Sequence, residues 1–174
     1  YDTDRNGVAT DTLEMHLGDK GVWRAAVPQK LYGKFYTFQV QCQGRWLDET
    51  PGIYAKAVGT NGKRAAIIDM SQTDPQGWGN DHGPMVKNIN DVVIYEMHHR
   101  DFSMHQSGGI VHKGKFLALT EKGTHNNSGA KTGIDHLKEL GVTHVHILPS
   151  YDFNSVDESN LPANKYNWGY DPQN

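Results

Sequence analysis

The spacing of apolar residues changes near residue 79 of this 174-residue chain, and this change limits the folds that the chain can adopt. Before it, Leu13, Met15 and Leu17 alternate with polar residues. Beyond it, two short apolar runs flank a segment with helical spacing. Alternation indicates strands with one buried face, whereas continuous apolar runs indicate strands buried on both faces. The chain is therefore expected to contain two different domains.

The first half carries the signals of short antiparallel strands. Residues 18–21, Gly-Asp-Lys-Gly, separate one alternating run from Val22 and Trp23, which predicts a hairpin. Residues 35–42 place four side chains on one face, as in a half-buried strand. These four are Tyr36, Phe38, Val40 and Cys42. Cys42 is expected to be a small core residue, and residues 1–78 are predicted to form a β-sandwich.

The second half predicts a strand, a helix and a parallel strand after a linker at residues 79–90. Residues 79–84 are turn formers, and residues 91–97 and 142–148 are strand-like. A helix fits residues 132–140, with Ile134, Leu137 and Leu140 along one side. Thr132 and Asp135 would cap its start, and Gly141 would close its end. His144 and His146 are expected to be hydrogen-bonded core residues on the second strand.

Charge and composition exclude several classes of function. The 17 basic and 20 acidic residues are interspersed, so a nucleic-acid partner is not expected. No apolar run is long enough for a membrane-spanning helix. A single cysteine cannot form an internal disulfide, and the ten histidines show no metal-ligand spacing. No cofactor and no metal site are therefore expected.

Residues 2–7, Asp-Thr-Asp-Arg-Asn-Gly, have the opening pattern of a calcium-binding loop. The twelfth position of such a loop should be a glutamate, but it is Leu13, and strand-like alternation flanks the segment. A polar turn is the alternative to a calcium site.

Residues 166–172, Tyr-Asn-Trp-Gly-Tyr-Asp-Pro, contain three aromatic rings, an amide and a carboxylate around a glycine. Aromatic faces pack on the C–H face of a sugar ring, and short polar side chains bind its hydroxyls. The segment therefore predicts a sugar-binding loop; the alternative is a loop whose aromatic side chains pin it to its own domain. The candidate binding residues are Tyr166, Asn167, Trp168, Tyr170 and Asp171.

These seven residues resemble the motif of type I pullulanases, bacterial debranching enzymes of the α-amylase family of glycoside hydrolases. Further segments of the chain resemble that family in the same order. They are residues 33–38, 61–64, 73–78, 94–98, 100–103, 141–149 and 151–153. The resemblance implies that this chain is the N-terminal portion of a longer enzyme.

The resemblance also implies a multidomain fold. Residues 1–78 would be an incomplete immunoglobulin-like β-sandwich of the carbohydrate-binding-module type. Residues 91–174 would be the first βαβ part of a truncated catalytic (β/α)8 TIM barrel, whose active site forms at the carboxyl ends of the strands. The remainder of the barrel, as missing residues or a second fragment, would be the partner of this chain.

For function, the resemblance implies retaining hydrolysis of α-1,6-glucosidic branches in pullulan, glycogen or amylopectin oligosaccharides. Tyr170 would stack on the sugar at the non-reducing side of the cleaved bond. The catalytic acids would come from later strands, so this chain supplies none; Asp101, Asp152, Asp157 and Glu158 are expected to be loop carboxylates. The alternative is a non-catalytic glucan-binding or inert fragment. Trp23 and Trp46 could bind sugar in the first module or could be core residues.

Overall fold

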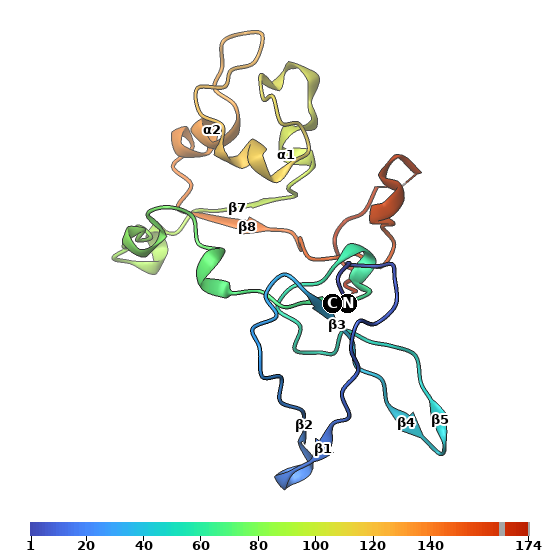
Figure 1. The fold of residues 1–174 in the computed structure, drawn as a ribbon. Helices are drawn as coiled ribbons and strands as arrows, with labels where there is room; N and C mark the ends of the chain where they lie inside the picture. Colours follow the sequence, from blue (N-terminus) through green and yellow to red (C-terminus); the bar gives the residue numbers. More distant parts are fainter. Residues whose placement is uncertain (164–165, 174) are drawn as a thin grey trace. The chain divides into compact units, whose positions relative to one another are not determined.

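The computed structural model describes residues 1–163 and 166–173, which form two compact units (Figure 1). Unit 1 contains residues 1–78, 152–163 and 171–173, and unit 2 contains residues 79–151 and 166–170. Because residues 152–163 return to unit 1, the chain leaves the first unit and comes back to it. The candidate sugar-binding loop is therefore divided, with its aromatic residues in unit 2 and its last residues in unit 1.

Unit 1 is rich in short strands, arranged as two-stranded antiparallel sheets. β1 (His16–Leu17) pairs with β2 (Trp23–Arg24), β3 (Phe35–Tyr36) with β6 (Ala65–Ala66), and β4 (Gln41–Cys42) with β5 (Arg45–Trp46). The 3-10 helices are η1 (Asp19–Gly21), η2 (Thr60–Gly62), η3 (Met70–Gln72) and η8 (Glu158–Ala163). The hairpin predicted around residues 18–21 is confirmed, because the Gly18 N–H donates to the Val22 carbonyl at 2.8 Å.

The single half-buried strand predicted for residues 35–42 is wrong. The segment is divided between β3 and β4, with an isolated bridge from Phe38 to Thr50 between them. Gln43 and Gly44, both with positive φ (49° and 77°), turn β4 sharply into β5. Phe38, Val40 and Cys42 are exposed, so Cys42 is not a core residue. Alternation marks a face that can be buried, but no second sheet covers this face among the described residues.

The centre of unit 1 lies at β6 and at Arg64, the residue before it. Ala65 is fully buried and Arg64 is only 7% exposed. The Arg64 guanidinium donates to the carbonyls of Thr3, Asn6 and Gly7 at 2.8–2.9 Å and lies 3.5 Å from the centroid of the Tyr1 ring. One buried cation therefore organises the first seven residues. Trp23 and Trp46 are both exposed, which makes their core alternative wrong.

Unit 2 is a βαβ arrangement. β7 (Ile94–Met97) pairs in parallel with β8 (His144–Ile147), with Ile94 opposite His144, which confirms the predicted parallel pair. The helices are α1 (Asp101–Met104) and α2 (Gly133–Glu139), with the 3-10 helices η5 (Ile89–Asp91), η6 (Gln106–Gly108) and η7 (Phe116–Thr120); η4 (Trp78–Asn80) spans the unit boundary. Its small core is Met97, Ile110, Ala118 and Leu137.

Helix α2 forms where its spacing predicted, but its predicted capping pair is wrong. The Thr132 hydroxyl donates to the Gly108 carbonyl at 2.6 Å instead of accepting from the helix, and the Asp135 carboxylate accepts from the Gly123 N–H. Both side chains therefore tie the preceding loop to the helix. The end of the helix is as predicted, with Gly141 at φ 73° following the C-cap residue.

The burial predicted for the strands of unit 2 is also wrong. Ile94 on β7 is 63% exposed, and Val145 and Ile147 on β8 are exposed as well. His144 and His146 are exposed, with His146 Nδ1 3.3 Å from a Glu96 carboxylate oxygen, so they are not core histidines. A two-stranded sheet leaves part of its apolar surface without a neighbour.

Within the described part of the chain, no helix has the length and apolar character needed to cross a membrane.

Candidate functional site

Tyr166, the first residue of the candidate loop, is held within unit 2 by residues that follow β7. Its hydroxyl donates to Asp101 Oδ2 at 2.6 Å, and Asp101 is the first residue of α1. Its ring centroid lies 5.6 Å from that of His98 and 5.3 Å from the guanidinium carbon of Arg100. The first residue of the loop therefore packs against the residues that follow the carboxyl end of β7.

The hydrogen bond to Asp101 raises the pKa of the Tyr166 phenol above its usual range, with smaller contributions from burial and from the Asp101 charge. The positive charge of Arg100 acts in the opposite direction. The phenol is therefore neutral, and a donor, throughout the physiological pH range. These contacts anchor Tyr166 at the start of the loop, while its side chain remains 41% exposed, which is compatible with the anchoring alternative and with sugar binding.

The middle of the loop presents two large rings to solvent. The Trp168 ring packs edge-on against Tyr166, with centroids 5.1 Å apart and planes at 87°. Asn167 Oδ1 accepts from the Gly169 N–H, and the buried Gly169, at φ 90°, turns the chain sharply. Trp168 is 63% exposed and Tyr170 is 67% exposed. Exposed rings beside a fixed turn can pack against the C–H face of a sugar.

Asp171 lies in unit 1 and holds the segment that follows β8. Its carboxylate accepts from the Ser155 N–H at 2.8 Å, and its carbonyl accepts from the Asn154 N–H at 2.8 Å. Pro172 forms a bridge with Phe153. Asp171 and Pro172 together therefore fix the backbone of residues 153–155.

Two of the carboxylates that could be mistaken for catalytic acids, Asp157 and Glu158, take part in turn and loop contacts. Asn61 donates its N–H to Glu158 at 2.6 Å and its amide group to Asp157 at 2.9 Å, and it accepts from the Glu158 N–H at 2.7 Å. Hydrogen bonds from Ser159 and Asn61 lower the pKa of Asp157. Burial and the charge of Glu158 raise the pKa of Asp152. Asp157 and Glu158 therefore join η8 to η2.

The calcium-like segment is folded as a polar turn. Asp2 pairs with Lys34, and Asp4 accepts from the hydroxyl and the N–H of Thr60. The Thr3 hydroxyl donates to the Asn6 carbonyl. The two carboxylates are thus bound by different neighbours. No cluster of three or more His, Cys, Asp or Glu residues suited to a metal occurs among residues 1–163 and 166–173.

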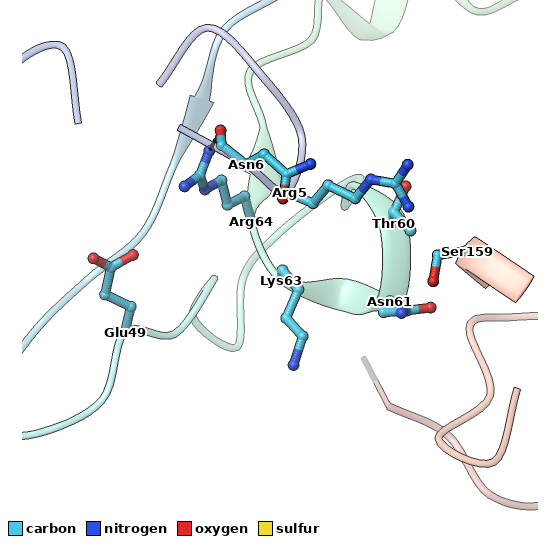
Figure 2. Close-up of a pocket in the computed structure, with 8 residues that line it drawn as sticks. All are labelled: Arg5, Asn6, Glu49, Thr60, Asn61, Lys63, Arg64 and Ser159. Atoms are coloured by element: carbon cyan, nitrogen blue, oxygen red, sulfur yellow. Dashed lines mark hydrogen bonds between the residues drawn. The ribbon is translucent and has the colours of Figure 1, made fainter. Parts of the chain in front are cut away.

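A separate cavity of about 380 Å³ lies in unit 1 (Figure 2). Its lining is Arg5, Asn6, Glu49, Thr60, Asn61, Lys63, Arg64 and Ser159. Glu49 accepts from the Tyr1 hydroxyl at 2.6 Å, and Arg64 is committed to the carbonyls of residues 3–7. The cavity contains none of the residues 166–172, so it is distinct from the candidate loop.

Sequence reasoning missed the three side chains that surround Tyr166, namely His98, Arg100 and Asp101. A signal was present, because these residues come directly after the predicted strand 91–97. Loops at the carboxyl ends of parallel strands collect functional residues. Asp101 was expected to be a loop carboxylate, whereas its hydrogen bond gives it a defined structural role.

Both the sequence and the fold of this chain are similar to those of known proteins. No family model matches the chain. The pullulanase of Bacillus subtilis (strain 168) is 42% identical over 161 residues, which are 92% of this chain and 22% of that protein. Crystal structures of the pullulanase from Paenibacillus barengoltzii match this chain with a TM-score of 0.93 and 48% sequence identity. The match covers all of this chain and 27% of the pullulanase. These structures include the apo form and a complex with maltohexaose and alpha-cyclodextrin. This chain is homologous to the bacterial pullulanases.

The homology confirms the resemblance seen in the sequence. The pullulanase from Bacillus acidopullulyticus gives a further structural match, with a TM-score of 0.92 and 44% sequence identity. This match covers all of the present chain and 21% of the pullulanase. This chain spans between about a fifth and about a quarter of the length of these pullulanases. Its fold is therefore that of one region of a pullulanase.

Proposed function

We propose that this chain is part of a pullulanase-type glycoside hydrolase that cleaves α-1,6-glucosidic branches by a retaining mechanism. The observation that carries the proposal is the structural match over the whole chain to pullulanases that are 44–48% identical. One of these, from Paenibacillus barengoltzii, has been crystallised with maltohexaose and alpha-cyclodextrin. An α-glucan substrate for this chain is proposed on that basis.

In this proposal, residues 1–78 belong to an immunoglobulin-like sandwich, residues 79–90 are a linker, and residues 91–174 begin a (β/α)8 barrel. The short antiparallel sheets of unit 1 support the first part, and the parallel β7–β8 pair supports the last. The nucleophile and the proton-donating acid of a retaining hydrolase would come from outside this chain.

The large exposed surface of the chain supports this enzyme reading over a free-standing fragment. The accessible surface is 13,605 Å². A folded monomer of 19.5 kDa is expected to expose about 8,500 Å². The apolar residues of β7 and β8 contribute to this excess, as does the exposed Phe116. Parallel strands are normally covered on both faces by other parts of a protein.

Within the loop, the proposal assigns the platform for the sugar to Tyr170, with Trp168 beside it. Asn167 and Asp171 hold the backbone on either side, and Tyr166 anchors the start of the loop. The exposure of the Trp168 and Tyr170 rings supports these roles, because a stacking ring must be open to its ligand.

The test is Tyr170→Ala in the full-length protein, with pullulan as substrate. Turnover should fall by about a hundredfold or more, because the sugar loses its orientation near the reacting groups. The unfolding midpoint in urea should stay unchanged, since the ring is largely exposed. The matched control is Tyr54→Ala, an exposed tyrosine of unit 1 outside the loop. Unchanged turnover in Tyr170→Ala would refute the assignment.

A further inference from the structure

We propose that Asp101 is a positioning residue for the aromatic loop: its hydrogen bond fixes Tyr166 and thereby sets the orientation of the Trp168 and Tyr170 rings. This inference rests on the proposed function of the loop. It adds Asp101, which lies 65 residues before Tyr166 in the sequence, to the residues that determine the geometry of the loop. In this proposal Asp101 acts through Tyr166 and does not contact the sugar.

The contact between Asp101 and Tyr166 is directional. A phenol that donates to a carboxylate at 2.6 Å forms a short, charge-assisted hydrogen bond. Ring contacts with His98 and Arg100 restrict the position of the Tyr166 ring, but they tolerate more rotation. The hydrogen bond therefore defines where the phenol lies.

Asp101 is itself part of a helix that further hydrogen bonds hold in place. It begins α1, where the Phe102 N–H donates to the His98 carbonyl at 3.0 Å. The next residue, Ser103, is buried, and its hydroxyl accepts from the Gly114 N–H at 2.7 Å. Binding residues placed on rigid elements hold their geometry better than those on free loops.

The position of Tyr166 affects the orientation of the exposed Trp168 and Tyr170 rings. Trp168 packs edge-on against it, at an interplanar angle of 87°. The Asn167 side chain closes the turn at Gly169, directly before Tyr170. Only three residues separate Tyr166 from Tyr170, so a displaced Tyr166 moves the Tyr170 platform.

The first experiment measures the titration of Tyr166 in the full-length protein. Tyrosines are labelled with carbon-13, and the Tyr166 signal is identified by its loss in Tyr166→Phe. In Asp101→Asn the pKa of Tyr166 should fall toward its ordinary value, because the charged acceptor is gone while Arg100 remains. The matched control, Asp91→Asn, changes an exposed aspartate of the same unit and should leave the pKa unchanged.

The second experiment measures turnover of pullulan. Tyr166→Phe removes only the hydroxyl, and kcat should fall about tenfold while KM changes less than about twofold, as expected when orientation is lost more than binding. Asp101→Asn should lower kcat by a smaller factor, because its amide oxygen still accepts a hydrogen bond. The double variant should be no worse than Tyr166→Phe alone, since both changes remove one interaction.

The outcomes separate this inference from the proposed function. If Tyr170→Ala abolishes turnover but Tyr166→Phe leaves kcat unchanged, the loop binds sugar and the positioning role of Asp101 is wrong. An unchanged Tyr166 pKa in Asp101→Asn would overturn the role as well. If instead Tyr170→Ala has no effect on turnover, the proposed function of the loop fails first, whatever the titration of Tyr166 shows.

Discussion

Arg64 shows how much of unit 1 depends on a single side chain. It is buried and charged, and its three hydrogen bonds to carbonyls of residues 3–7 are joined by the contact with the Tyr1 ring. A buried guanidinium is tolerated only when its donors are bound, and the planar fork of arginine suits several carbonyls at once. Arg64 therefore binds residues 1–7 at three carbonyls, in addition to the contacts of Asp2 with Lys34 and of Asp4 with Thr60.

Replacing Arg64 by methionine should lower the free energy of unfolding by about 1–3 kcal/mol, because the carbonyls of Thr3, Asn6 and Gly7 lose their shared donor. Urea unfolding of the full-length protein measures this, and hydrogen exchange should become faster in residues 1–7. Arg24→Met on β2, an exposed arginine, is the control and should change stability by less than about 0.5 kcal/mol. Equal effects of the two substitutions would contradict the role of Arg64.

At the residue scale, the order of residues 166–172 indicated a sugar-binding loop through its resemblance to the pullulanase motif, whereas composition alone left an anchoring loop equally open. They did not indicate that Asp101 would bind Tyr166. The partners lie 65 residues apart, and no local spacing encodes such a contact. The exposure of Cys42 was missed for a similar reason, since alternation shows only that one face can be buried.

The loop between η6 and η7 illustrates the element scale, because one carboxylate holds it closed. Glu121 accepts from the N–H groups of Val111 and His112 at 2.8 and 2.7 Å, and His112 Nδ1 lies 2.8 Å from the same carboxylate. Two backbone donors lower the pKa of Glu121, with a smaller effect from the His112 ring. A charged Glu121 is therefore part of the folded loop.

This arrangement predicts an acid-sensitive loop. The pKa of Glu121 is lower in the folded state, so its stabilising contribution is present above the ordinary glutamate pKa and is lost as pH falls through the folded value. Hydrogen exchange at Val111 and His112, corrected for the intrinsic rate, should show more opening as the pH falls below the ordinary range of the glutamate pKa. Glu121→Gln should show this opening at neutral pH and little further pH dependence. Equal protection of these amides in both proteins would contradict the prediction.

Local patterns located many of the elements correctly, but not their surroundings. The hairpin at residues 18–21, the parallel β7–β8 pair and helix α2 all follow from spacing and turn residues. The cap of α2 was wrong because Thr132 and Asp135 bind the preceding loop, a tertiary contact that competes with the local one.

At the scale of the whole molecule, the main difference from the sequence-based prediction is that apolar strand residues are exposed. Ile94 and Val145 were predicted to be buried, and the accessible surface of the chain exceeds the value expected for its mass by about 5,000 Å². The sequence pattern describes a strand buried on both faces, while the chain itself supplies only one neighbouring strand. The sequence therefore encodes packing that these residues do not complete alone.

The most direct test of the account is the crystal structure of the full-length protein with a bound maltooligosaccharide. The account predicts that the Tyr170 ring packs on a glucose ring next to the scissile position, with the carboxylates of the reaction on other parts of the polypeptide. It also predicts that Tyr166 still donates to Asp101 in that complex. A structure in which Tyr170 points away from every cleft lined by carboxylates would contradict it.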